Sequence, residues 1–127
     1  MKYKDICFFN IAWVKNISSE EIVLEEVSSF VLTGLGKNGI DSAKDLHFTR
    51  FTQSHHAECQ PRTFSFEDLG LFRANIESQK RIFGANIGSW STKEELPQGI
   101  IEDREASKFI MFQIESNSSW YYEIGDK

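Results

Sequence analysis

The first regular pattern along the chain is an alternation of apolar residues near the N-terminus. Between residues 6 and 14 every odd position is apolar: Cys7, Phe9, Ile11 and Trp13. A period of two that uses aromatic and β-branched residues is typical of a strand with one buried face. We therefore expect a strand over residues 6–14.

A helical pattern follows from Ser19 to Thr33. Apolar residues recur at helical spacing within this range and just after it, at Leu24, Val27, Val31 and Leu35. Ser18 and Glu21 have the spacing of a capping box, and Gly34 and Gly36 stand where a helix would end. These features predict a first amphipathic helix over residues 19–33.

A second amphipathic helix is predicted over residues 66–83. Ser65 and Asp68 form another capping signature, and Gly84 follows the last apolar position. One face of this helix would be apolar, made of Phe66, Leu69, Phe72, Ile76 and Phe83. The polar stretch before it, residues 54–60, is expected to be a loop closed by Pro61.

The remaining segments favour strands. Residues 46–53 are rich in Phe and Thr, and residues 108–115 alternate with apolar side chains on both faces. Residues 116–119 resemble a turn and residues 120–124 a return strand, which together predict a C-terminal hairpin. A short strand is expected over residues 87–91, and Thr92 with Glu95 is expected to cap one helical turn before Pro97.

These elements predict an α+β fold, with an antiparallel or mixed β-sheet of four to six strands and the two amphipathic helices packed on one of its faces. The sequence shows no internal repeat, low-complexity tract or linker. We therefore expect a single α+β domain over residues 1–127.

Composition and charge narrow the function classes. Of the 127 residues, 40% are hydrophobic and 13% aromatic, which is enough apolar surface to exclude disorder as the main state. The net charge of −5 disfavours a nucleic-acid partner, because phosphate binding needs a basic face. No apolar run is long enough to span a bilayer. Asp5 and Asn10 interrupt the N-terminal apolar run, so we expect a cytoplasmic protein without a signal peptide.

The leading functional hypothesis comes from acidic and aromatic residues in the last third of the chain. Carboxylates there favour a basic partner, and Trp and Tyr are enriched at binding hot spots. The chain resembles small cytoplasmic inhibitors of toxic nucleases, such as immunity proteins and antitoxins, in size, charge and lack of catalytic motifs. The sequence thus predicts a non-enzymatic protein-binding module that occludes a basic partner such as a nuclease, through Glu94, Glu95, Glu102, Asp103, Trp120 and Tyr122.

The alternative hypothesis is a small metal-independent hydrolase or ribonuclease. All three histidines, His47, His55 and His56, lie within ten residues, and a histidine can act as a general base at neutral pH. Arg50 or Arg62 could then stabilise a developing negative charge.

Other site types are disfavoured. The histidines are followed by Glu58 and Cys59, which are also zinc ligands, but neighbouring residues on a strand point to opposite faces. The sequence has no G-x-S-x-G elbow, P-loop or dinucleotide fingerprint. We therefore expect neither a metal site nor a cofactor.

Overall fold

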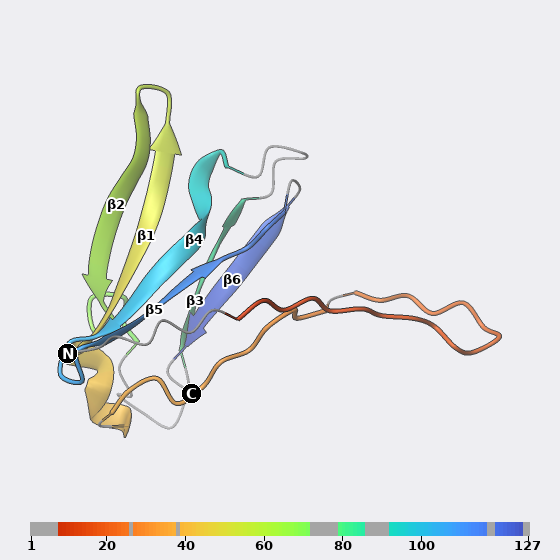
Figure 1. The fold of residues 1–127 in the computed structure, drawn as a ribbon, viewed down its shortest axis with the longest axis horizontal. Helices are drawn as coiled ribbons and strands as arrows, with labels where there is room; N and C mark the ends of the chain where they lie inside the picture. Colours follow the sequence, from red (N-terminus) through yellow and green to blue (C-terminus); the bar gives the residue numbers. More distant parts are fainter. Residues whose placement is uncertain are drawn as a thin grey trace. The chain divides into compact units, whose positions relative to one another are not determined.

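The computed structural model describes residues 8–25, 27–37, 39–71, 79–85, 92–116 and 119–125. The chain divides into two units, Met1–Thr33 and Gly34–Lys127, and each is described by itself. The described residues of the second unit form a short 3₁₀ helix, η1 (Gly39–Lys44), and six strands (Figure 1). The strands are β1 (Leu46–Ser54), β2 (Ala57–Ser65), β3 (Lys80–Ala85), β4 (Glu94–Asp103), β5 (Lys108–Gln113) and β6 (Trp120–Gly125). The prediction of a single domain over residues 1–127 stays a prediction.

The strands form two antiparallel sheets. Four of them make one sheet in the order β2-β1-β4-β5, and β3 pairs with β6 in the other. In the first sheet Phe48 of β1 lies opposite Phe64 of β2 and Ile101 of β4. In the second sheet Phe83 lies opposite Tyr122.

The two sheets pack against each other through aromatic rings. Phe48 is fully buried, and its ring centroid lies 5.1 Å from that of Phe83 and 5.9 Å from that of Tyr122. Phe112 of β5 meets Tyr122 edge to face at 4.9 Å. Because alternate side chains of each strand point inward, a two-layer core of this kind follows from the period of two. The other buried hydrophobic residues of this core are Leu46, Phe66, Leu71 and Ile124.

Gly99 of β4 lies where the aromatic rings leave no room for a side chain. A Cβ added at Gly99 would lie 2.7 Å from ring atoms of both Phe48 and Phe112. We expect Gly99→Ala to lower the free energy of unfolding by about 1–3 kcal/mol, because both rings must move to accept it. Urea unfolding measures this loss, and an unchanged midpoint would show that the rings have room to move.

The structure corrects the predicted α+β fold. The described residues contain no α-helix, and the second unit is nearly all β. The first predicted helix, residues 19–33, is absent from the part of that range that is described. Its β-branched residues, among them Ile22, Val23 and Val27, are poor helix formers, and a helix of this length needs a packed apolar face to be stable. In this unit the same side chains are exposed.

The second predicted helix, residues 66–83, is also wrong. The capping signature itself forms, since the Ser65 amide donates to Asp68 Oδ2 at 3.0 Å and the Asp68 amide to Ser65 Oγ at 2.9 Å. These bonds close a turn over residues 66–70, which ends at Gly70 with a φ of +71° that favours glycine. The chain then runs into Leu71, residues 72–78 lie outside the described part, and Lys80–Ala85 is strand β3.

Three strand predictions are confirmed, but the way they pair is not. The expected strands at residues 46–53, 108–115 and 120–124 correspond to β1, β5 and β6. The predicted C-terminal hairpin is wrong, because β5 pairs with β4 and β6 pairs with β3 in the other sheet. The chain therefore crosses between the sheets where a hairpin turn was expected.

Two predicted non-strand segments are strands. Residues 54–60 are not a loop, since only His55 and His56 form a turn and β2 begins at Ala57. The strand β2 lies at an edge of its sheet, where exposed polar side chains are common, and this explains its polar sequence. Thr92 and Glu95 do not cap a helical turn, because β4 begins at Glu94. The strand expected over residues 87–91 lies outside the described residues.

The first unit has neither helix nor strand in its described residues, 8–25 and 27–33. Asn10 Nδ2 donates a hydrogen bond to the backbone oxygen of Ser29. The stretches of chain around these two residues therefore lie side by side (Figure 1). The strand expected over residues 6–14 is absent from its described part, residues 8–14, where no neighbouring strand completes a ladder.

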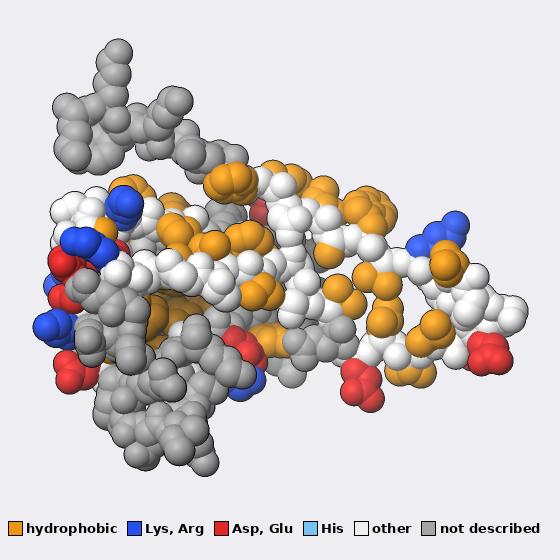
Figure 2. All heavy atoms as spheres, turned by 90° about the horizontal axis from the view of Figure 1, so that it is seen from below, with side chains coloured by type: hydrophobic (Ala, Val, Ile, Leu, Met, Phe, Trp, Pro, Cys, Tyr) orange, Lys and Arg blue, Asp and Glu red, His pale blue; other side chains and the backbone are white. Residues whose placement is uncertain are grey.

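The hydrophobic side chains of this unit lie at the surface (Figure 2, right side of the view). Surfaces of this kind mark sites where another molecule binds. The exposed large hydrophobic residues of this unit are Phe8, Phe9, Ile11, Trp13, Val14, Ile17, Ile22, Val23, Leu24, Val27, Phe30, Val31 and Leu32.

Candidate binding surface

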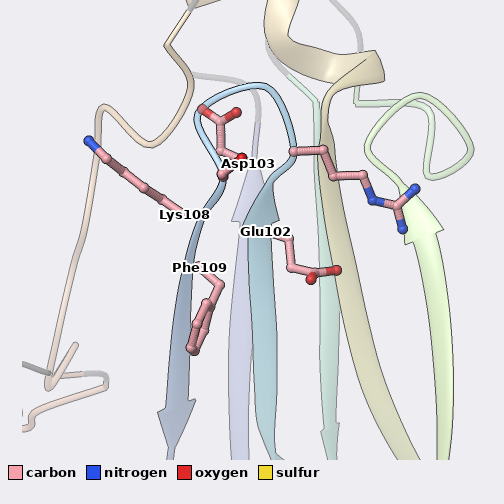
Figure 3. A pocket seen from close by; sticks show the side chains of 6 residues that line it. Glu102, Asp103, Lys108 and Phe109 are labelled. Atoms are coloured by element: carbon pink, nitrogen blue, oxygen red, sulfur yellow. The ribbon is translucent and has the colours of Figure 1, made fainter. Parts of the chain in front are cut away.

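The turn that joins β4 to β5 carries a shallow hollow of about 290 Å³. Figure 3 shows that acidic, basic and aromatic side chains surround it, with Glu102 and Asp103 from the end of β4 and Lys108 and Phe109 from the start of β5. Arg104 and Ser107 of the turn complete its lining. Both signs of charge are present, so this hollow is not a purely acidic site.

Asp103 supports this turn from within. Its Oδ1 accepts the Ala106 amide at 2.8 Å and its Oδ2 accepts the Lys37 amide at 3.2 Å. The hydrogen bond from Ala106 is the main reason why the pKa of the Asp103 carboxyl lies below its ordinary value. Asp103 is 7% exposed, so its carboxylate holds the turn and is turned away from a partner.

Glu102 lies on the opposite, outer face of the same sheet. The strand register places it between His47 of β1 and Phe109 of β5. The next row of this face contains Ile100 of β4 and Met111 of β5. Phe109 is 67% exposed and Met111 is 56% exposed, which is unusual for apolar residues on a regular strand.

The strand β5 also lies at an open edge of the four-stranded sheet. Within the described residues only β4 pairs with it, so the backbone groups of its other side are free to bond to another chain. From Phe109 to Gln113 this strand contains no charged residue and no proline. Apart from the exposed Lys108 at its start, β5 therefore lacks the charged residues and proline that normally prevent an edge strand from pairing.

The opposite edge of the same sheet, β2, is protected. It contains Pro61, which cannot donate a backbone hydrogen bond, and the exposed charged residues Glu58 and Arg62. Among the described residues, the two edges of this sheet thus differ, and of these two only β5 combines an unpaired edge with exposed large apolar side chains.

A second group of polar residues lies between the sheets. Arg50 Nη1 and Glu95 Oε1 form an ion pair, with 29% and 14% of the two side chains exposed. The Arg50 guanidinium carbon lies 5.8 Å from the ring centroids of Phe64 and Phe83. Burial raises the pKa of Glu95, and the nearby Arg50 opposes that rise.

Three buried polar atoms of this group have no hydrogen-bond partner among the described residues. They are Arg50 Nε, Glu95 Oε2 and Tyr122 Oη. Burial, together with the negative charge of Glu95, raises the pKa of the Tyr122 phenol. The group holds its ion pair inside the fold, so Glu95 does not offer its charge to a partner.

The four predicted acidic contacts fall at the two ends of β4. Glu94 and Glu95 begin the strand, and Glu102 and Asp103 end it, so about 25 Å separates the two pairs at the rise of a strand. Of these four residues only Glu94 is exposed, while Glu95 and Glu102 are half-buried and Asp103 is buried. Glu94 lines a second hollow of about 370 Å³, together with Gln53, Ser54, His55, Glu58 and Lys93.

The two predicted aromatic contacts point into the fold. Trp120 is 7% exposed, and its ring stacks on that of Tyr122 with a centroid distance of 5.7 Å. Tyr122 in turn contacts the rings of Phe83 and Phe112. Tyr121, between them, points outward. The predicted contact residues did not include the exposed apolar residues of β5. The sequence did contain a signal for them, since residues 108–115 are apolar on both faces of the strand.

The structure does not assemble the predicted histidine site. His55 and His56 lie together in the β1–β2 turn, with ring centroids 3.9 Å apart, but His47 is at the other end of β1. Arg50 and Arg62 are opposite each other in the register, yet Arg50 is occupied by Glu95. These five side chains do not converge as an acid–base site would.

The described residues contain no group of three or more His, Cys, Asp or Glu side chains that could hold a metal ion. They also contain no helix with the length and apolar character needed to cross a membrane. In comparisons with known proteins, the chain matches no protein family, no curated protein sequence and no solved structure.

Proposed function

We propose that this chain is a non-enzymatic protein-binding module that receives an extended segment of its partner along the open edge of β5. Strand addition supplies backbone hydrogen bonds to the partner, and side chains on the face of the strand select its sequence. The observation that supports the proposal is the contrast between the two edges of the sheet, with β2 protected and β5 open and apolar.

Two side chains of β5 would make apolar contacts with the partner. Phe109 and Met111 lie two residues apart on the outer face, as neighbouring contacts on one face of a strand do. Burying them would stabilise the complex, because large apolar side chains that leave water contribute roughly 1.5–3 kcal/mol each. No covalent chemistry is required of the chain.

The charge of the partner follows from the surroundings of this strand. Glu102 lies beside Phe109 on the outer face, and the whole chain has a net charge of −5. A partner with a cationic residue next to an extended apolar segment is the best complement. An acidic inhibitor of a basic nuclease, of the immunity-protein or antitoxin type and cytoplasmic, is the specific form of this proposal that the sequence favours.

Site-specific photo-crosslinking tests where the partner binds. A photoreactive phenylalanine analogue is placed at Met111 on β5, and in a separate chain at Gln60 on β2, which is also exposed. In the producing cells we expect a covalent protein adduct from position 111 and none from position 60. Equal adducts from both positions, or adducts from position 60 alone, would contradict the proposal.

Lysine substitutions test how much the two apolar side chains contribute to the affinity for the partner. Phe109→Lys together with Met111→Lys is expected to weaken partner binding at least tenfold, or about 1.4 kcal/mol, since both apolar contacts are lost. Ile82→Lys is the matched control, because Ile82 is an exposed apolar residue on β3 with 58% exposure. Isothermal titration calorimetry with the partner protein that the crosslinking identifies measures the affinity of each variant. Equal losses in control and test variants would exclude β5 as the specific site.

A further inference from the structure

We infer that the extended segment received by β5 is residues 8–14 of a second copy of this chain. This inference rests on the proposed strand-accepting role of β5, but it assigns that edge to a second copy of the chain and not to a basic protein. The first unit contains an apolar segment that pairs with no strand among the described residues. The second unit contains a sheet whose edge strand, β5, is apolar and unpaired on its outer side.

The segment has the sequence of a strand. Phe9, Ile11 and Trp13 alternate on one side, and Phe8 and Val14 belong to the other. Its seven residues match the six residues of β5 in length. In the described residues it pairs with no strand, so its backbone groups are available for a ladder.

The exposed area of the segment is large enough for a stable contact. Phe8, Phe9 and Trp13 are 82%, 75% and 89% exposed. Since aromatic side chains bury about 150–250 Å² each, these three alone supply roughly half of the 800 Å² per partner that a standard interface needs. Ile11 and Val14 on the segment, with Phe109 and Met111 on the strand, add to this area.

The charge pattern agrees with this pairing. Residues 8–14 contain no charged side chain, and neither do residues 109–113. Pairing the segment with residues 109–113 therefore buries no unpaired charge and leaves Lys108 at the end of the ladder, whereas pairing with β2 would place the segment beside Glu58 and Arg62. This selects β5 over the other edge.

A second copy is the partner that these observations specify. Each chain carries one segment and one open edge, so two copies can exchange segments and form two such contacts in one dimer. The two contacts reinforce each other, because the second forms within an already associated pair. The chain would thus cover its own exposed hydrophobic surface by self-association.

Sedimentation velocity of the full chain tests this inference over a range of concentrations. We expect reversible self-association that Ile11→Pro weakens at least tenfold, because proline removes a ladder hydrogen bond. Met111→Lys on β5 should weaken it to a similar extent. Ile17→Pro is the matched control, since Ile17 is 91% exposed in the same unit but outside the segment, and it should associate as the unmodified chain does.

Each other outcome overturns the inference. A chain that stays monomeric, or an Ile17→Pro control that loses as much association as Ile11→Pro, shows that residues 8–14 are not the bound segment. Weakening by Met111→Lys but not by Ile11→Pro shows that β5 receives another segment. In that case, or if the adduct at position 111 contains only a different protein, this inference fails while the proposed function of β5 holds.

Discussion

Replacing Phe48 with alanine should lower the free energy of unfolding by about 3–5 kcal/mol. Phe48 is the fully buried ring on which the two sheets meet, in contact with Phe83 and Tyr122. Removing the ring leaves a cavity between the two sheets. The strands of each sheet are held in place by their ladders, so neighbouring side chains can fill only part of the space. Urea unfolding followed by tryptophan fluorescence measures the loss.

The matched control is Phe109→Ala, which removes the same ring from the outer face. Because Phe109 is 67% exposed, this change should alter stability by no more than about 0.5 kcal/mol. A large loss at Phe109, or a small one at Phe48, would mean that the inner and outer faces of the sheet are assigned the wrong way round. The pair of variants therefore also tests whether Phe109 is free to bind a partner.

Replacing Arg50 with methionine should lower the free energy of unfolding by about 3 kcal/mol at neutral pH. The change leaves the Glu95 carboxylate between the sheets without its ion-pair partner, and an unpaired buried charge is costly. The loss should be smaller in acid. Burial already raises the pKa of Glu95, so the folded state holds its proton more tightly than the unfolded state, and stability falls as pH rises through this window.

The double variant Arg50→Met with Glu95→Leu tests whether the loss of stability in Arg50→Met comes from the unpaired charge of Glu95. Removing both charges should recover most of the stability lost in Arg50→Met, because apolar residues of similar size can replace a buried ion pair. If the double variant is less stable than the single one, Glu95 must have a role that does not depend on Arg50. Thermal unfolding of the three proteins at neutral and acid pH measures both effects.

Local patterns in the sequence predicted individual strands but not their pairing. The Phe and Thr content around Phe48 marked β1, and the alternation around Phe112 marked β5, because both are properties of a single strand. Which strand lies beside which depends on contacts between distant residues. The turn at residues 104–107 joins β5 to β4, and β6 crosses to the second sheet.

The predicted helices failed for a different reason. Ser65 and Asp68 do make the expected reciprocal hydrogen bonds, but such bonds stabilise a single turn as well as a helix start. The residues after Asp68 decide between a turn and a helix. Here Gly70 adopts a left-handed conformation and the chain leaves the helical path.

The candidate site was predicted only in part, because residue type does not reveal exposure. Trp120 and Asp103 are residues typical of a binding surface, yet one packs in the core and the other accepts backbone hydrogen bonds. Phe109 and Met111 are typical core residues, yet they lie in solvent. Since β6 joins the second sheet, it does not pair with the outer edge of β5, and no local pattern contains that information.

Hydrogen exchange of the β5 amides, with and without the bound partner, tests the central claim most directly. In the free chain the amides of residues 108–113 that face away from β4 should exchange fast, because within the described residues nothing pairs with that edge. Binding should slow those amides and leave β2 unchanged. If the protection appears on β2, β3 or β6 while β5 continues to exchange fast, the partner binds elsewhere and this account of the chain is wrong.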